Sequence, residues 1–182
     1  MLLGRSKTKG NTVIEFTLVG IPVTSALVSI FQMFRGMWMY HTLASAVKDG
    51  ARFAIVHGND CNLPPSNCAI TIRDVSQRIR DYAIGIPPQE IQNVTFTSRT
   101  RTVTCATLAA CLGTEGEGNT YWPAAAPGAT ADDGGEAMMG WVQITAQYSF
   151  RSAIAMFWPG AGRGQNFGTF VFPASSREMI AY

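Results

Sequence analysis

The stretch Gly10-Asn11-Thr12-Val13-Ile14-Glu15-Phe16 opens the part of the sequence that decides the fold. Before it stands a leader, residues 1–10, that contains basic residues and no acidic one. After it, no residue between Phe16 and Phe34 is charged, and this length suits a helix that spans the hydrocarbon core of a bilayer. A carboxylate beside such a segment is costly in lipid, so Glu15 is a candidate functional residue.

This pattern resembles the amino terminus of the type IV pilin superfamily, in which a prepilin peptidase cuts after a glycine and glutamate is fifth in the mature chain. Here Gly10 matches the glycine, Asn11 the new amino terminus, and Glu15, which precedes Phe16, the fifth residue. A second match is Asp49-Gly50-Ala51-Arg52-Phe53-Ala54, about a helix length downstream. Residues 11–56 thereby resemble a TadE-like minor pilin, or pseudopilin, of the tight-adherence (Tad) pilus system. The rest of the chain matches only in general layout.

The resemblance implies a structural component that helps to initiate or complete a Tad pilus. It implies that a prepilin peptidase removes residues 1–10 and that Glu15 and Phe16 serve assembly. For Asp49, Gly50 and Arg52 it favours a packing or assembly role. The partners that it implies are other pilins and minor pilins, the membrane platform of the pilus, the peptidase and membrane lipid.

The charges that flank the apolar segment predict its orientation. All charged residues of the leader are basic, whereas the charges after the segment are mixed in sign: Arg35, Lys48, Asp49 and Arg52. The positive-inside rule places the amino terminus of a single-pass protein in the cytoplasm and the remainder outside. The resemblance implies that the membrane is the bacterial cytoplasmic membrane. Two alternatives stay open, a conventional signal peptide cut near Thr24-Ser25-Ala26 and an uncleaved signal anchor.

One long helix is predicted from residue 11 to residue 57, with its membrane segment at about 13–36. In the second half, apolar residues recur every three to four positions and form one stripe: Tyr40, Leu43, Val47, Ala51 and Ile55. We expect this stripe to pack on an exported domain, residues 58–182.

Particular residues of the helix carry more specific predictions. Glu15 is expected in the first turn, where a negative charge meets the positive end of the helix dipole. Pro22 is expected to bend the helix. Gly50 either permits the close approach of another element or weakens the helix. Asp49 and Arg52 are three residues apart and are expected to pair on the helix surface.

Four cysteines, Cys61, Cys68, Cys105 and Cys111, all follow the apolar segment. An even number on one side of a membrane suits an oxidising compartment. Of the possible pairings, the short local loops favour Cys61–Cys68 with Cys105–Cys111, and four free buried thiols are the alternative. Zinc is disfavoured, because the spacings are not C-x-x-C and no histidine lies beside them.

The order of helical and strand patterns in the exported part predicts an α+β fold, with an antiparallel sheet packed against the long helix. A short helix is expected over 72–84, with Val75, Ile79 and Tyr82 on its apolar side. Strand character fills 91–104 and 141–150, and closing strands are expected at 170–172 and 179–182. The connection over 107–140 is rich in Gly, Ala and Pro; its Tyr121 and Trp122 are either contact residues or aromatics tucked onto the domain.

The sequence offers no pattern for catalysis, for a metal or cofactor, or for nucleic-acid binding, so we expect no enzyme. The net charge is +2 and the basic residues are scattered. His41 and His57 are far apart on the predicted helix, without an acidic cluster, and are expected to be solvated or capping residues. G-x-S-x-G, H-E-x-x-H and Walker sequences are absent. Two functions compete: a Tad pilus component, and a membrane-anchored exported binding module unrelated to pili.

Overall fold

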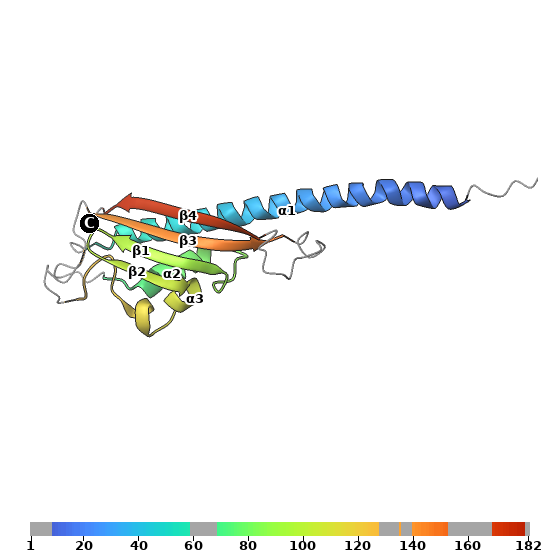
Figure 1. Ribbon diagram of the computed structural model, residues 1–182. Coiled ribbons are helices and arrows are strands. Elements are labelled where there is room, and N and C mark those ends of the chain that lie inside the picture. Colours follow the sequence, from blue (N-terminus) through green and yellow to red (C-terminus); the bar gives the residue numbers. More distant parts are fainter. Residues whose placement is uncertain (1–8, 59–68, 128–134, 136–139, 153–168, 181–182) are drawn as a thin grey trace, which may run out of the picture.

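The computed structural model describes residues 9–58, 69–127, 135, 140–152 and 169–180. The predictions for residues 1–8, for Cys61 and Cys68 and for residues 181–182 lie outside this part of the chain. Among the described residues, a long helix, α1, projects from a domain built of a four-stranded sheet and shorter helices (Figure 1). The predicted α+β class is confirmed.

The helix α1 runs from Lys9 to Ile55, close to the predicted range of 11–57. Because the leader residues Lys9 and Gly10 are already helical, the first turn contains no acidic residue and Glu15 lies in the second turn. The expected first-turn position of Glu15 is therefore wrong for the unprocessed chain. Pro22 lies inside α1, and the helix continues through it without a break.

The second half of α1 packs on the domain, as its apolar stripe predicts. Three of the predicted stripe residues are fully buried: Leu43, Val47 and Ala51. Tyr40 is 40% exposed and meets the ring of Phe172 edge-on, with centroids 6.0 Å apart. The buried surface is wider than predicted, because small residues beside the stripe also face the domain: Ala46, Gly50 and Ala54.

Four antiparallel strands form the sheet in the order β2-β1-β3-β4. Their bounds are β1 Ile91–Ser98, β2 Thr102–Thr107, β3 Trp141–Arg151 and β4 Thr169–Met179. β3 confirms the strand predicted over 141–150, since its residues alternate between buried and partly exposed along its length. The buried side of β3 contributes Val142, Ile144, Ala146, Tyr148 and Phe150 to the core.

Two strand predictions are corrected. The stretch 91–104 holds not one strand but most of a hairpin, β1 and β2, whose turn is closed by a 2.7 Å bond from the Ser98 N–H to the Arg101 carbonyl. That turn contains no Gly, Pro, Asn or Asp, so no residue typical of turns predicts it. The closing strand predicted at 170–172 belongs to a longer strand, β4, which runs through Pro173 and ends at Met179, so of the strand predicted at 179–182 only Met179 is in β4 and Ile180 is not. Proline is tolerated because β4 is an edge strand.

The helix α2 covers Ile72–Tyr82 and ends two residues earlier than predicted. Its start is fixed by Asp74, whose carboxylate accepts a 2.8 Å hydrogen bond from the Thr71 N–H. Val75 and Ile79 are fully buried, as predicted. Tyr82 is 43% exposed, so its assignment to the apolar side is wrong.

Part of the long connection over 107–140 is structured. It contains α3, Leu108–Cys111, and a 3-10 turn at Gly116–Asn119. Trp122 is 1% exposed and packs edge-on against Phe96, with ring centroids 5.4 Å apart. Trp122 is thus a core residue and not a contact residue, because a β-bridge between Thr71 and Tyr121 ties this segment to the start of α2.

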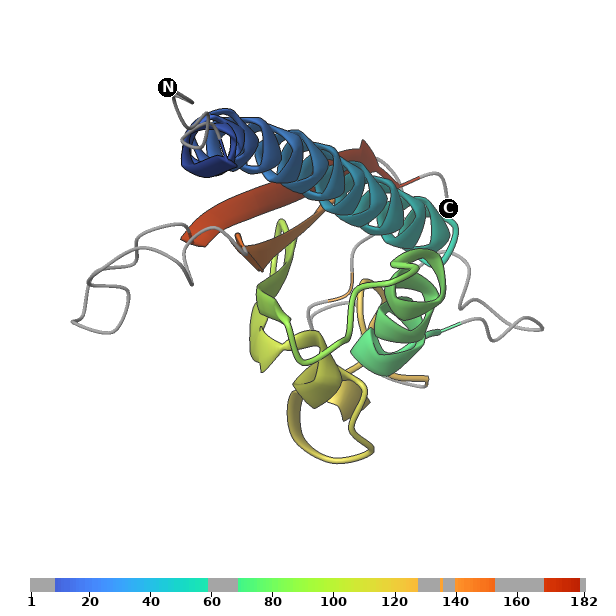
Figure 2. The ribbon, with the colours of Figure 1, turned by 90° about the vertical axis from the view of Figure 1, so that its right-hand side faces the viewer.

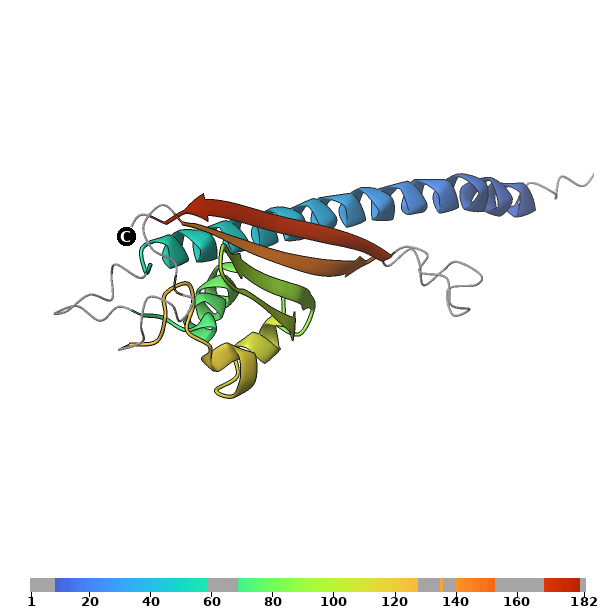
Figure 3. The ribbon, with the colours of Figure 1, turned by 60° about the vertical axis from the view of Figure 1, so that its left-hand side comes forward.

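The helices α1 and α2 lie side by side, and α1 packs on β3 and β4 (Figure 2). The amino-terminal half of α1 extends past the end of the sheet (Figure 3). The fold therefore divides one continuous helix into a projecting half and a half that is part of the domain core.

Candidate functional site

The projecting half of α1 exposes apolar side chains between Val13 and Phe34. The exposed fractions of Phe16, Leu18 and Phe31 are 77%, 74% and 73%. Length and hydropathy make α1 a candidate membrane span, and its most apolar window is not buried in the domain at all. A helix that is apolar without a polar face is suited to lipid or to other apolar helices, not to water.

Polar side chains within this half bond to the helix itself. The Thr17 hydroxyl donates to the Ile14 carbonyl at 2.9 Å, and the Ser29 hydroxyl donates to the Ser25 carbonyl at 2.8 Å. The Thr24 hydroxyl donates to the Gly20 carbonyl in the same way. Because hydrocarbon offers no hydrogen-bond partner, this internal bonding lowers the cost of placing these residues in a membrane.

The candidate processing and assembly residues lie on the first turns of α1. The bond between Gly10 and Asn11 is inside the helix, and Glu15 and Phe16 lie on the exposed part just beyond it. Residues four apart share one side of a helix, so position 11 and Glu15 lie one above the other. Cleavage after Gly10 would place the new amino group about one helical turn before Glu15.

The Asp49-Gly50-Ala51-Arg52 motif lies where α1 meets α2. A Cβ atom at Gly50 would lie 2.6 Å from Cγ1 of Ile79, closer than real Cβ contacts come. Gly50 therefore permits a close approach of α2 that a larger residue would prevent. Of the two roles predicted for Gly50, close approach of another element or a weak point in the helix, the structure shows the close approach.

The Asp49 carboxylate binds Arg78 of α2, with 2.8 Å between Nε and Oδ2. The predicted pair between Asp49 and Arg52 is wrong, because α2 supplies a nearer cation and the Arg52 side chain is exposed. The Arg78 guanidinium also lies over the Tyr82 ring, 4.7 Å from its centroid. Its hydrogen bond with Asp49 raises the pKa of Arg78 above its ordinary value, so the guanidinium stays charged.

The sequence does not predict that Arg78 is the partner of Asp49, because 29 residues separate the two. The only signal in the sequence is that Arg78 belongs to the charged side of the predicted short helix, where it is one of several arginines. Which of them reaches α1 depends on how the two helices cross.

Cys105 and Cys111 form a disulfide, as predicted, with their Cα atoms 5.7 Å apart. The bond joins the end of β2 to α3, and both cysteines are buried. It therefore holds the start of the 107–140 connection against the sheet.

The two histidines have separate surroundings. Nδ1 of His57 lies 2.7 Å from the Phe53 carbonyl at the end of α1, which fits the capping role. His41 is exposed and its ring centroid lies 5.6 Å from that of Tyr40. In the described part of the chain, no group of three His, Cys, Asp or Glu residues is placed to hold a metal ion.

These features define a class of protein in which, among the described residues, one helix is a candidate membrane span and its far half is built into a small α+β domain. A family model described as TadE-like protein matches residues 10–52. The match begins at Gly10 and ends at Arg52, so it covers the projecting half of α1 and its crossing with α2, and it leaves the sheet outside. This match confirms the TadE-like resemblance and supports the interpretation of the chain as a component of the Tad pilus system. No curated protein and no solved structure matches the chain significantly.

Proposed function

We propose that this protein is a minor pilin or pseudopilin that takes part in the assembly of a Tad pilus. The division of α1 carries the proposal: the projecting half is apolar and outside the domain, and the other half is buried in it. A helix divided in this way can exchange lipid for the apolar helices of other subunits while the domain keeps its structure. The TadE-like match over this helix supports the same role.

In this proposal the protein is structural and has no catalytic activity. A prepilin peptidase cuts after Gly10, the amino terminus lies in the cytoplasm and the α+β domain lies outside the cytoplasmic membrane. Glu15 meets the free amino group of an adjacent subunit and sets the axial register of packing. Other pilins and the membrane platform are the partners that the projecting half contacts.

Amino-terminal sequencing and intact mass of the protein extracted from its host membrane test the proposal. The mature chain is expected to begin at Asn11, and deletion of the gene is expected to lower the number of surface pili, with recovery on complementation. A chain that begins at Leu27 or retains Met1, together with normal piliation in the deletion strain, would overturn it.

A further inference from the structure

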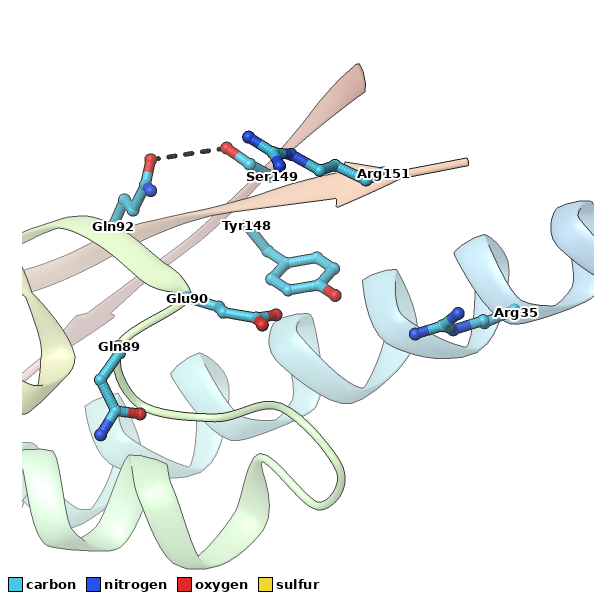
Figure 4. A pocket seen from close by; sticks show the side chains of 7 residues that line it. All are labelled: Arg35, Gln89, Glu90, Gln92, Tyr148, Ser149 and Arg151. Carbon is cyan, nitrogen blue, oxygen red and sulfur yellow. Dashed lines mark hydrogen bonds between the residues drawn. The ribbon is translucent and has the colours of Figure 1, made fainter. Parts of the chain in front are cut away.

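A polar cavity lies between α1, the start of β1 and the end of β3 (Figure 4). Its volume is about 320 Å³, and it is lined by Arg35, Gln89, Glu90, Gln92, Tyr148, Ser149 and Arg151. This volume is within the range of pockets that hold small molecules. None of these residues has a role in the proposed assembly function.

The cavity lies at the level where the candidate membrane span ends. Arg35 directly follows Phe34 and is the first charged residue after Glu15. From Val13 to Arg35 the helix rises roughly 33 Å at 1.5 Å per residue, about the thickness of the hydrocarbon core. Once α1 spans a membrane, Arg35 is therefore level with the lipid headgroups.

The end of the sheet lies at the same level as Arg35. A Cβ atom at Gly36 would lie 3.5 Å from Phe172 and 3.8 Å from Phe150, so the ends of β3 and β4 adjoin this turn of α1. Phe170 and Val171 on β4 are 57% and 53% exposed. Exposed apolar residues at this end of the sheet fit contact with the lipid surface.

The cavity contains charges of both signs that do not pair with each other. Within the described residues, Arg35 and Glu90 take part in no ion pair. The Arg35 guanidinium lies 5.9 Å from the centroid of the Phe150 ring, and the Glu90 carboxylate points toward the Tyr148 hydroxyl. Figure 4 shows the side chains of Arg35, Glu90 and Tyr148 converging on one space. Both residues are exposed, so a ligand that carries an anion and a cation can reach both charges and complement them.

The hydroxyl of Tyr148 stays a hydrogen-bond donor here. Burial raises the pKa of Tyr148 above its ordinary value, and the negative charge of Glu90 raises it further. The Tyr148 hydroxyl therefore lies beside the Glu90 carboxylate, whose oxygens can accept hydrogen bonds from a bound cation.

We propose that this cavity binds the headgroup of phosphatidylethanolamine, a phosphate ester with a primary ammonium. Arg35 binds the phosphate, Arg151 adds positive charge at the rim, and Glu90 accepts hydrogen bonds from the ammonium. A choline headgroup has no N–H to donate to Glu90, and a glycerol headgroup brings no cation to it. The inference rests on the proposed membrane anchorage of α1.

The test uses the full chain in nanodiscs that contain phosphatidylethanolamine, phosphatidylcholine and phosphatidylglycerol in equal amounts. After extraction in mild detergent, native mass spectrometry counts the lipids that stay bound. We expect several-fold more phosphatidylethanolamine than phosphatidylcholine on the wild-type protein. Glu90→Gln should bring this ratio close to one, and Arg35→Gln should lower the retention of both lipids. Arg52→Gln, an exposed arginine on the same helix away from the cavity, is the matched control and should change neither.

Equal retention of the two lipids by the wild-type protein, or a ratio that Glu90→Gln leaves unchanged, would overturn the inference. A thermal unfolding curve of each variant shows whether the fold is kept. Soluble O-phosphoethanolamine is added in a second arm and should displace the lipid better than phosphocholine does. Binding of the soluble compound by a protein that does not select phosphatidylethanolamine would overturn the assignment to a lipid.

This experiment is independent of the proposed pilus function. Lost lipid selectivity with normal processing and piliation would overturn only the headgroup site. Normal selectivity in a protein whose deletion leaves piliation unchanged would overturn only the pilus role.

Discussion

Gly50 sets the distance between α1 and α2, because Ile79 of α2 fills the space that a side chain at position 50 would occupy. A methyl group at this position would lie 2.6 Å from Cγ1 and 3.1 Å from Cδ1 of Ile79, inside a fully buried part of the core. The carboxylate next to it, Asp49, binds Arg78 across the same crossing. The family match ends just after this crossing, at Arg52.

Gly50→Ala is expected to destabilise the protein by about 1–3 kcal/mol, since overpacking forces the helices apart. The better helix propensity of alanine offsets up to about 1 kcal/mol of this loss. The measurement is denaturant unfolding of the full chain in detergent. Gly20→Ala is the matched control: its Cβ would lie 3.9 Å from Phe16, an ordinary contact, so it should not destabilise.

A double change separates the clash from other effects of the substitution. Ile79→Ala removes the atoms that a methyl group at Gly50 would strike, so Gly50→Ala should cost less in that background than in the wild type. Equal stability of Gly50→Ala and the wild type would mean that the helices do not pack as closely as described.

Glu15 is the other residue whose substitution is informative. Glu15→Gln should keep the helix and the domain, because glutamine has a similar helix propensity. It should weaken association with other pilins and lower piliation, because opposite charges near lipid attract more strongly than in water. Glu15→Asp should be intermediate, since the shorter side chain keeps its charge but loses reach.

Co-purification with partner pilins and fibre counts measure the effect of Glu15. Protein level, processing and membrane location of each variant are checked first. A Glu15→Gln protein that is processed, stable and equal to the wild type in both assays would show that Glu15 has no role between subunits.

At the scale of elements, the Cys105–Cys111 disulfide connects β2 to α3 and precedes the segment that brings Trp122 into the core. Replacing both cysteines by serine is expected to lower the free energy of unfolding by about 2 kcal/mol, a modest value because the closed loop is short. Thermal unfolding of the two proteins without reductant measures the difference, and the wild type treated with reductant should approach the variant.

Peptide mapping without reduction shows which cysteines are joined. A Cys105–Cys111 cross-linked peptide is expected. A peptide that joins Cys61 to Cys105 would contradict the pairing, and four alkylatable thiols in the native protein would contradict an oxidising compartment as well.

At the scale of the whole molecule, the projecting half of α1 adds membrane affinity and little domain stability. Its apolar residues up to Phe34 are exposed, whereas fully buried apolar residues of α1 begin at Leu43. A fragment of residues 35–182 is therefore expected to fold and to unfold within a few degrees of the full chain. Circular dichroism and gel filtration of the fragment test this.

A shorter fragment provides the contrast. Residues 46–182 lack Leu43 and the turn of α1 that contacts Phe172, so part of the core opens and the fragment should unfold at a clearly lower temperature. If fragment 35–182 aggregates or is unfolded while the full chain is stable, the projecting half is part of the folding unit.

Local patterns along the chain were enough to predict several parts of the fold and of the candidate site. The uncharged run after Glu15 determined the projecting helix, and the spacing of Leu43, Val47 and Ala51 determined which side of it is buried. Alternation over 141–150 determined β3, and short spacing determined the Cys105–Cys111 pair. These features follow from residues near one another in sequence, so the sequence alone contains them.

Only the tertiary structure decided the features that depend on distant residues. Asp49 pairs with Arg78 and not with Arg52, because the crossing of two helices brings a residue 29 positions away closer than a neighbour on the same helix. Trp122 is buried because Phe96 and the bridge to Thr71 enclose it, although its local sequence is that of a surface loop. The cavity between Arg35, Glu90 and Tyr148 joins three separate segments. No periodicity relates these segments, and only packing of α1 against the sheet places their side chains together.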